Sequence, residues 1–256
     1  MSATQRIQLQ PCYLLHRRPF RDSSQLLEIF SLDYGRISLV GRGVSRRRRG
    51  GSLGSLLQPF RPLLVSYSSR GDLGTLTGVE SGGESARTPE GERLFSALYL
   101  NELLTRLLHR HEAHRDLFAG YASAIEALCC GQPLAPTLRR FEFALLDALG
   151  YGVDLEHDVD LGAPLDSQTL YRVEPEQGVR VAREVREGEE GLFRGEELLA
   201  IAHGDFEGHR ASPALRLTRQ LLAPYLGVEP LRSRALFRSA RAGGGQGQGH
   251  GQGAGA

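Results

Sequence analysis

The sequence predicts an α+β fold in which a small N-terminal β-barrel precedes a mainly α-helical region with a small β insertion. Two observations predict this class. Up to about residue 82, short apolar segments alternate with polar residues and turn-forming residues, as half-buried strands do. From residue 92 onward, apolar residues recur at helical spacing. With 256 residues, of which 40% are hydrophobic and 24% charged, the chain can bury a core of this size.

The predicted barrel contains five or six strands. Asp-Tyr-Gly, Gly-Gly and Arg-Gly-Asp stretches separate them, and such residues favour turns. A closed barrel removes exposed strand edges, and an OB-fold is the expected architecture, because its strands and loops form a groove for single-stranded nucleic acid. The candidate strands are IQLQPCYLLH, QLLEIFS, GRISLVGRG, SLLQPFRPLLVSY and LGTLTGVE, and the clearest alternations are Ile7 with Leu9, Leu27 with Ile29, and Ile37 with Leu39.

The helical region is predicted to begin with three helices, over residues 92–110, 117–128 and 136–150. Gly150 is the expected C-terminal cap of the third. Residues 171–185 could form a hairpin, residues 196–204 a short helix, and Ser212 with Pro213 marks the start of a last helix. We therefore expect a barrel domain over residues 1–82, a helical domain over 83–240 with a small mixed insertion at about 155–210, and a disordered Gly/Gln-rich tail over 241–256.

Charge is unevenly distributed along the chain, although the net charge is only +1; the chain has no lysine, so its 31 Lys-or-Arg positions are all arginine. Residues 1–82 contain 12 arginines against 5 acidic residues, and residues 211–256 contain 6 against 1. The intervening residues 83–210 contain 13 arginines against 24 acidic residues. Such separation is typical of proteins that bind a nucleic acid through their basic parts. Chance clustering on solvated faces is the alternative interpretation.

Four stretches in order resemble the RecO family of bacterial DNA repair proteins, over about residues 5–240. They are YGRISLVGRGVSRRR followed by LQPFRPLLVSY, then YLNELLTRLL, then LRRFEFALLDALGYGVDL, and LAPYLGVEPLRSRALFR. The resemblance implies an N-terminal OB-fold and a helical C-terminal region. It also implies a recombination mediator that binds single- and double-stranded DNA and anneals complementary strands. With RecR, and with RecF as a further candidate partner, such a protein helps to load RecA onto DNA coated by single-stranded-DNA-binding protein (SSB).

The segment GRGVSRRRRGG at residues 41–51 matches the basic segment that contributes to DNA binding in the family. Several arginines that neutralise phosphates supply affinity independent of base sequence, and neighbouring glycines let the backbone approach the strand. A solvated loop that only aids solubility is the alternative. Tyr34, Phe60 and Tyr67 are candidates for stacking on bases, or else they fill the barrel core. The predicted DNA-binding residues are Arg42, Arg46, Arg47, Arg48 and Arg49, extended by Arg17, Arg18, Arg21, Arg61 and Arg70.

The LRRFE motif predicts a second site. An arginine pair on an apolar helix can clamp a C-terminal carboxylate, and Leu138 and Phe141 would help to line a pocket for an aromatic side chain. Relatives that resemble this chain are thought to bind the acidic, Phe-ending tail of SSB on the helical domain, which suggests Arg139 and Arg140 as contacts. Alternatively, Phe141 belongs to the core and the arginines pair with acidic residues such as Glu142.

No metal, cofactor or catalytic site is expected. Some family members hold zinc with cysteines just after the GYGVDL-like segment, but here that stretch is EHDVDLGAPLDS, without cysteine. Structural zinc requires four Cys or His ligands, and Cys12, Cys129 and Cys130 lie elsewhere. The chain has no phosphate-binding loop, nucleophile elbow or HExxH pair. Two alternatives to the mediator remain: a metal-dependent nuclease that uses the carboxylates of residues 156–160, and a protein-interaction scaffold.

The sequence also predicts a cytoplasmic, nucleoid-associated protein that does not bind a membrane. No apolar run approaches the roughly 18–20 residues that would span a bilayer, and the N-terminus lacks the apolar centre of a signal peptide.

Overall fold

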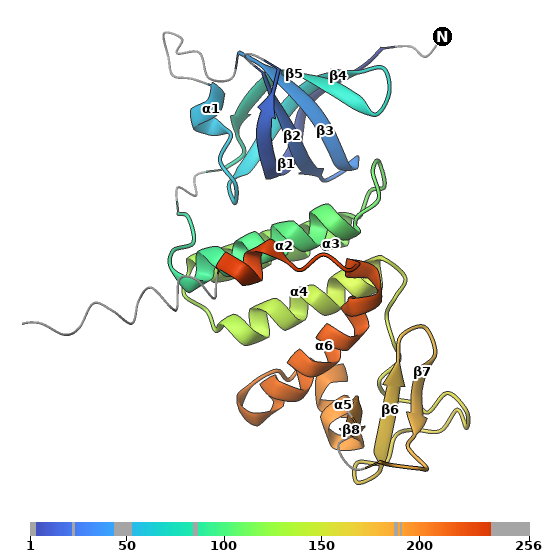
Figure 1. The fold of residues 1–256 in the computed structure, drawn as a ribbon. Helices are drawn as coiled ribbons and strands as arrows, with labels where there is room; N and C mark the ends of the chain where they lie inside the picture. Colours follow the sequence, from blue (N-terminus) through green and yellow to red (C-terminus); the bar gives the residue numbers. More distant parts are fainter. Residues whose placement is uncertain are drawn as a thin grey trace, which may run out of the picture.

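The computed structural model describes residues 4–21, 24–43, 53–83, 87–186, 189 and 191–236. The architecture is α+β, as predicted: an N-terminal barrel is followed by a helical region that contains a small sheet (Figure 1). The segment with Arg46, Arg47, Arg48 and Arg49 lies outside the described residues, and so does the predicted tail at 241–256. None of the described helices is long and apolar enough to cross a membrane.

Within the described residues, five strands close into a barrel in the order β1-β2-β3-β5-β4. All neighbours are antiparallel except β3 and β5, which run parallel. A short helix that the sequence did not predict, α1 (Leu53–Leu56), lies between β3 and β4 in the sequence. The strands are β1 (Gln5–Phe20), β2 (Ser24–Ser31), β3 (Gly35–Arg42), β4 (Pro62–Ser69) and β5 (Leu73–Ser81).

The helical region contains α2 (Glu92–Leu107), α3 (Arg115–Cys129), α4 (Leu134–Ala148), α5 (Gly195–Ala202) and α6 (Ala211–Leu226), with a 3-10 turn at Gly208–Arg210. The inserted sheet has the order β7-β6-β8, formed by β6 (Leu170–Glu174), β7 (Gly178–Val181) and β8 (Leu192–Arg194). The sequence predicted the β6–β7 hairpin but not β8, because three residues are too few to show alternation.

Helix α2 ends three residues earlier than predicted, and the barrel explains why. Leu108 has an extended backbone (φ −71°, ψ 132°) and still donates its N–H to the carbonyl of Leu104. Beyond it, Arg110 forms a parallel bridge with Arg36 of β3, and the N–H of His111 donates to the Arg36 carbonyl at 3.0 Å. Pairing with the barrel therefore replaces the last helical turn.

Two hydrophobic cores meet at β1. The barrel interior contains Cys12 and Leu14, whereas Tyr13 and Leu15 belong to the core of the helical region. This division follows from strand geometry, because successive side chains point to opposite faces. Strand β1 is thus buried on both faces in its middle.

Aromatic packing and a buried polar chain join the barrel to the helices. The ring of Tyr13 lies 5.4 Å from that of Phe118 and 5.0 Å from that of Tyr121, measured between centroids. The Tyr121 hydroxyl donates to Asn101 Oδ1 at 2.6 Å, and Asn101 Nδ2 donates to the carbonyl of Leu15 at 2.9 Å. Buried hydrogen bonds of this kind fix one relative position of the packed elements. The barrel and the helices therefore form one unit.

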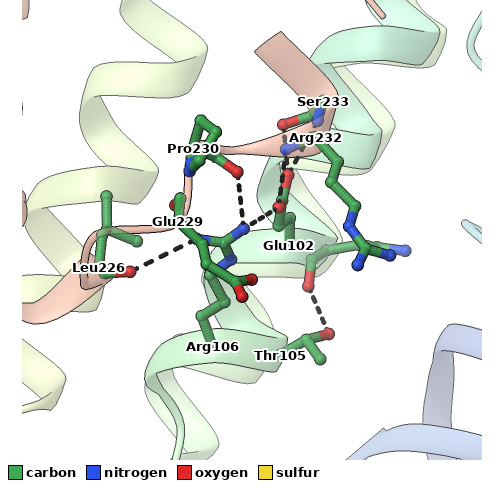
Figure 2. A network of polar contacts seen from close by, with 9 residues as sticks. Glu102, Thr105, Arg106, Leu226, Glu229, Pro230, Arg232 and Ser233 are labelled. Atoms are coloured by element: carbon green, nitrogen blue, oxygen red, sulfur yellow. Dashed lines mark hydrogen bonds and ion pairs between the residues drawn. The ribbon is translucent and has the colours of Figure 1, made fainter. Parts of the chain in front are cut away.

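The chain returns to α2 after α6, where Glu102 and Arg106 hold it (Figure 2). Glu102 accepts hydrogen bonds from the backbone N–H groups of Arg232 and Ser233, each at 2.9 Å, and from the Ser233 hydroxyl at 2.7 Å. Arg106 is paired with Glu102 at 2.8 Å and donates to the backbone carbonyls of Leu226, Glu229 and Pro230. Residues 226–233 are thus fastened along α2.

Candidate nucleic-acid interface

Three of the predicted DNA-binding arginines gather at one end of the barrel. Ser24 pairs with Phe20 on one side and with Arg42 on the other, and neighbouring strands lie about 4.8 Å apart. Arg18, two residues before Phe20, and Arg21, which follows it, are exposed, as is Arg42. The guanidinium of Arg21 lies over the Phe20 ring, 5.3 Å from its centroid. We call Arg18, Arg21 and Arg42 the basic end of the barrel.

The basic end is also where the arginine-rich segment begins. Arg42 is the last residue of β3, and residues 43–52 follow before α1. Arg46–Arg49 lie outside the described residues, so their contribution stays a prediction. The segment therefore leaves the barrel at Arg42, within the basic end. The chain after it is bonded to β1, because Arg17 donates to the carbonyl of Gly54.

Arg17 has a different environment from its neighbour Arg18. Its Nη1 donates to the carbonyl of Leu57 at 3.1 Å and to that of Gly54 at 3.4 Å. Leu57 is fully buried in the barrel core. Arg17 therefore holds α1 and the residues after it against this end of the barrel, and its guanidinium is occupied by backbone carbonyls.

Arg61 and Arg70 differ from the arginines of the basic end, Arg61 in exposure and Arg70 in position. Arg61 is half-buried just before β4, whereas Arg70 is exposed in the β4–β5 loop. Arg70 Nε donates to the hydroxyl of Thr4. Of the ten predicted arginines, three form the basic end (Arg18, Arg21 and Arg42) and four lie outside the described residues (Arg46–Arg49). The other three, Arg17, Arg61 and Arg70, have the separate environments given above.

The three candidate stacking residues also differ in exposure. Phe60 and Tyr67 are each 5% exposed, and Phe60 packs in the helical core while Tyr67 packs in the barrel core. Tyr34 is only partly buried, and its ring meets that of Tyr67 at a 6.2 Å centroid distance and an 85° angle. Phe60 and Tyr67 are thus core residues. Of the three candidates, only Tyr34 has a ring that is partly accessible to solvent.

The LRRFE motif lies in α4, with one arginine inside and one outside. Arg139 is 5% exposed and its Nη2 lies 2.6 Å from Glu142 Oε1, while Phe141 is buried in the core. The Tyr99 hydroxyl donates to the same carboxylate at 2.7 Å, and burial followed by the Glu142 charge raises the pKa of Tyr99. Arg140 is exposed and Leu138 is half-buried. In this structure Arg140 is the member of the pair that reaches solvent.

The carboxylates of residues 156–160 have separate partners. Asp158, which is 3% exposed, accepts backbone hydrogen bonds from Asp160 and Leu161 at Oδ1 and from Val181 at Oδ2. Burial acts to raise the pKa of Asp158, but these hydrogen bonds outweigh it and the pKa is lowered. Asp160 pairs with Arg180 at 3.3 Å, and Glu156 lies 4.0 Å from His203. Asp158 thus secures a turn against β7.

The stretch after α4 contains His157 and several carboxylates but no cysteine. Among the residues that the structure describes, no group of three or more His, Cys, Asp or Glu side chains is placed to hold a metal ion. His157 Nδ1 contacts Asp154 Oδ2 at 2.9 Å and has no thiolate near it in this stretch. Cys12 is buried in the barrel, and Cys129 and Cys130 lie at the end of α3.

Sequence reasoning did not assign the polar contacts across the junction between the barrel and the helices. Arg36 Nη1 donates to the Thr105 carbonyl, Arg110 pairs with Glu28, and Arg115 pairs with Asp33. Their separation in the chain, from 69 to 82 residues, leaves no local pattern by which sequence alone could pair them.

Comparisons with known proteins agree with this organisation. Residues 6–82 match the family model described as Recombination protein O N terminal, and residues 89–235 match Recombination protein O C terminal. The DNA repair protein RecO of Pseudomonas aeruginosa is 42% identical over 233 residues, which covers 91% of this chain and 95% of the relative. That of Stutzerimonas stutzeri is 44% identical over 91% of this chain and 94% of the relative, and that of Nitrosococcus oceani is 44% identical over 92% and 95%. This chain therefore belongs to the RecO family of DNA repair proteins.

Proposed function

We propose that the chain is a non-enzymatic recombination mediator that binds single- and double-stranded DNA and anneals complementary strands. With RecR, and RecF as a further candidate, it helps to load RecA onto DNA coated by SSB. It works in the cytoplasm, at the nucleoid. Membership of the RecO family supports a role in DNA repair and recombination. DNA annealing and the loading of RecA are the activities that we propose in addition.

The basic end of the barrel is the observation that carries the proposal. Arg18, Arg21 and Arg42 are exposed on adjacent strand ends, and the arginine-rich segment starts from the last of them. Arginines that contact phosphates release counterions, which supplies affinity for any DNA sequence. Annealing requires two strands to approach with reduced repulsion, and a cluster of arginines lowers that repulsion.

The exposed part of the LRRFE motif supports a proposal for the SSB tail. Arg140 is free to meet a carboxylate at the surface of α4, beside half-buried Leu138. Arg139 and Phe141 support the same helix from inside. We propose that the tail contacts Arg140 and Leu138 directly, with Arg139 and Phe141 shaping the surface beneath it.

The test compares wild-type protein with a variant in which Arg42 and Arg46–Arg49 are all changed to Ala. It measures single-strand affinity against salt, and annealing of an SSB-coated oligonucleotide. We expect both activities to fall with the far-UV spectrum unchanged, and the salt slope to decrease by about 0.7 for each phosphate that the variant no longer neutralises. A matched control changes Arg183 and Arg186, which are exposed in the insertion, to Ala.

The alternative functions give different results in the same experiment. A protein-interaction scaffold would show no change in DNA binding when the arginines are removed. A metal-dependent nuclease would degrade the oligonucleotide and lose that activity in EDTA, whereas annealing by charge neutralisation persists in EDTA. Either of those results would overturn the mediator proposal.

A further inference from the structure

A pocket of about 310 Å³ opens on the barrel between the β4–β5 loop and the α2–α3 loop. Its lining includes Tyr34, Tyr67, Arg70, Asp72, Gly74 and His111. The barrel supplies the first five of these residues and the helical region supplies His111. We call this the junction pocket. The sequence predicts Tyr34, Tyr67 and Arg70 singly as candidate DNA contacts, and the structure brings them together with His111.

The junction pocket opens toward the end of β3 opposite to the basic end. The parallel register pairs Ser38 of β3 with Leu73 of β5, so the loop at residues 70–72 stands beside the start of β3. Arg42 is at the other end of that strand. Seven residue steps from Gly35 to Arg42, at roughly 3.3 Å each, place the outer edge of the pocket about 23 Å from Arg42. Its lining extends along β3 to Leu39, three residues before Arg42. In Figure 1 the α2–α3 loop and α1 accordingly lie at opposite sides of the barrel.

Two aromatic residues, Tyr34 and Tyr67, line the pocket. Burial, followed by the neighbouring Tyr34, raises the pKa of Tyr67, so this phenol stays neutral. Tyr67 meets Tyr34 at 85° from within the core, which leaves the partly buried Tyr34 to present its ring. Gly74 keeps β5 close to these rings, because an added Cβ would lie 2.6 Å from a methyl carbon of Leu39 and 3.3 Å from the Tyr67 ring.

Two basic side chains stand at the rim. Arg70 uses Nε to bond Thr4, and among the described residues its terminal nitrogens have no partner. The His111 side chain is 43% exposed, and its Nε2 lies 3.9 Å from Oδ1 of Asp72. The Asp72 side chain is 89% exposed, so water screens it and it can move aside for an incoming anion.

The loop that carries His111 is held firmly against the barrel. His111 adopts a left-handed backbone (φ 61°) and donates its N–H to the Arg36 carbonyl at 3.0 Å. Gly35 (φ 60°) packs so closely on this loop that an added Cβ would lie 1.7 Å from the Glu112 carbonyl oxygen. A left-handed histidine persists only where its surroundings impose it. The position of His111 at the rim is therefore built into the fold.

From these features we propose that the junction pocket binds one nucleotide of single-stranded DNA, with the base stacked on Tyr34 and its phosphate against Arg70 and His111. This inference rests on the proposed DNA-binding function and adds a contact that distinguishes single-stranded from double-stranded DNA. A single strand exposes base faces for stacking on aromatic side chains, whereas paired bases in a duplex keep theirs stacked on one another. The basic end contacts phosphates and accepts either form. The pocket accepts only the single strand.

The test uses Tyr34→Leu, Tyr34→Phe, Arg70→Gln and His111→Asn. Leu keeps apolar bulk at residue 34, Phe keeps the ring, and Asn tolerates the left-handed backbone of residue 111. Binding is measured to an oligothymidine and to a hairpin duplex over a range of salt. We expect Tyr34→Leu to weaken single-strand binding about tenfold with an unchanged salt slope, and Tyr34→Phe to bind as wild type. Arg70→Gln should reduce the slope by about 0.7, and His111→Asn should weaken single-strand binding less than Tyr34→Leu.

Duplex binding separates this inference from the proposed function. We expect all four variants to bind the duplex as wild type does. If the variants lose affinity equally for the oligothymidine and the duplex, or lose affinity for neither, the proposed role of the pocket is wrong while the DNA-binding function stands. Failure of the wild-type protein to bind any DNA would overturn both. As a second readout, an oligothymidine with one 5-iododeoxyuridine should crosslink under ultraviolet light to the peptide that contains Tyr34, and crosslinks confined to other peptides would refute the site.

Discussion

The guanidinium of Arg139 and the carboxylate of Glu142 form an ion pair inside the helical region, with 2.6 Å between Nη2 and Oε1 and side chains that are 6% and 1% exposed. Tyr99 of α2 donates its hydroxyl to the same carboxylate oxygen at 2.7 Å. The pair thus links α4 to α2. Its two charges depend on each other, because neither has water to replace its partner.

We expect Glu142→Ala to lower the free energy of unfolding by about 3–5 kcal/mol, since it leaves the Arg139 charge buried without a partner. Urea denaturation measures this change. Arg140→Ala, at the next and exposed position, is the matched control and should stay within about 0.5 kcal/mol of wild type. A Glu142→Ala variant as stable as the control would show that the charges are hydrated in solution.

Arg17 and Arg18 are neighbours in sequence with opposite expected effects. Arg17→Ala removes hydrogen bonds to the carbonyls of Leu57 and Gly54. Because the Arg17 side chain is exposed to water, this should lower the free energy of unfolding by about 0.5–1.5 kcal/mol. Arg18→Ala should change stability by less than about 0.5 kcal/mol and weaken DNA binding instead. Thermal unfolding and single-strand titration on both variants check this, and equal effects of the two on stability would contradict it.

Glu102 predicts an acid-sensitive attachment of the chain after α6. Burial acts to raise the pKa of Glu102, but hydrogen bonds from Ser233 and Arg232 together with the Arg106 charge lower it overall. A carboxyl group whose pKa is lowered by folding stabilises the native state above its unfolded pKa of about 4.3, and that contribution disappears as the pH falls through the folded value. Limited proteolysis with an acid-active protease should therefore cut within residues 227–236 more readily as the pH falls below about 4.3.

Glu102→Ala should produce the same release at neutral pH, because it removes the acceptor for three hydrogen bonds. Glu112→Ala is the control, since the Glu112 side chain is 57% exposed. Protection that is unchanged in Glu102→Ala would mean that apolar contacts such as buried Leu231 hold this segment by themselves.

Zinc should be absent from the purified protein at stoichiometric levels, and EDTA should leave its unfolding temperature unchanged. The stretch after α4 offers His157 and carboxylates that already serve as hydrogen-bond acceptors or ion-pair partners. Structural zinc favours tetrahedral Cys and His ligands instead. Elemental analysis by mass spectrometry gives the answer, and one zinc per chain with a lowered unfolding temperature in EDTA would refute the prediction.

Local patterns were sufficient for most of the architecture. Alternation in the first 82 residues and helical spacing after residue 92 predicted the barrel, the helices and the β6–β7 hairpin, because these periodicities reflect which face of each element is buried. The end of α2 was misplaced because pairing of Arg110 with Arg36 is a contact between distant parts of the chain. The arginine-rich segment was also visible in the sequence, since its composition is unusual.

The environment of each side chain depended instead on packing between elements. Nothing local distinguishes Arg17 from Arg18, or Arg139 from Arg140, yet in each pair one guanidinium bonds a protein group and the other meets solvent. Likewise, Tyr34, Arg70 and His111 come together only because the barrel closes and the α2–α3 loop packs on β3. Composition and periodicity specify the elements and their buried faces, whereas contacts between residues far apart in sequence arise only when those faces pack together.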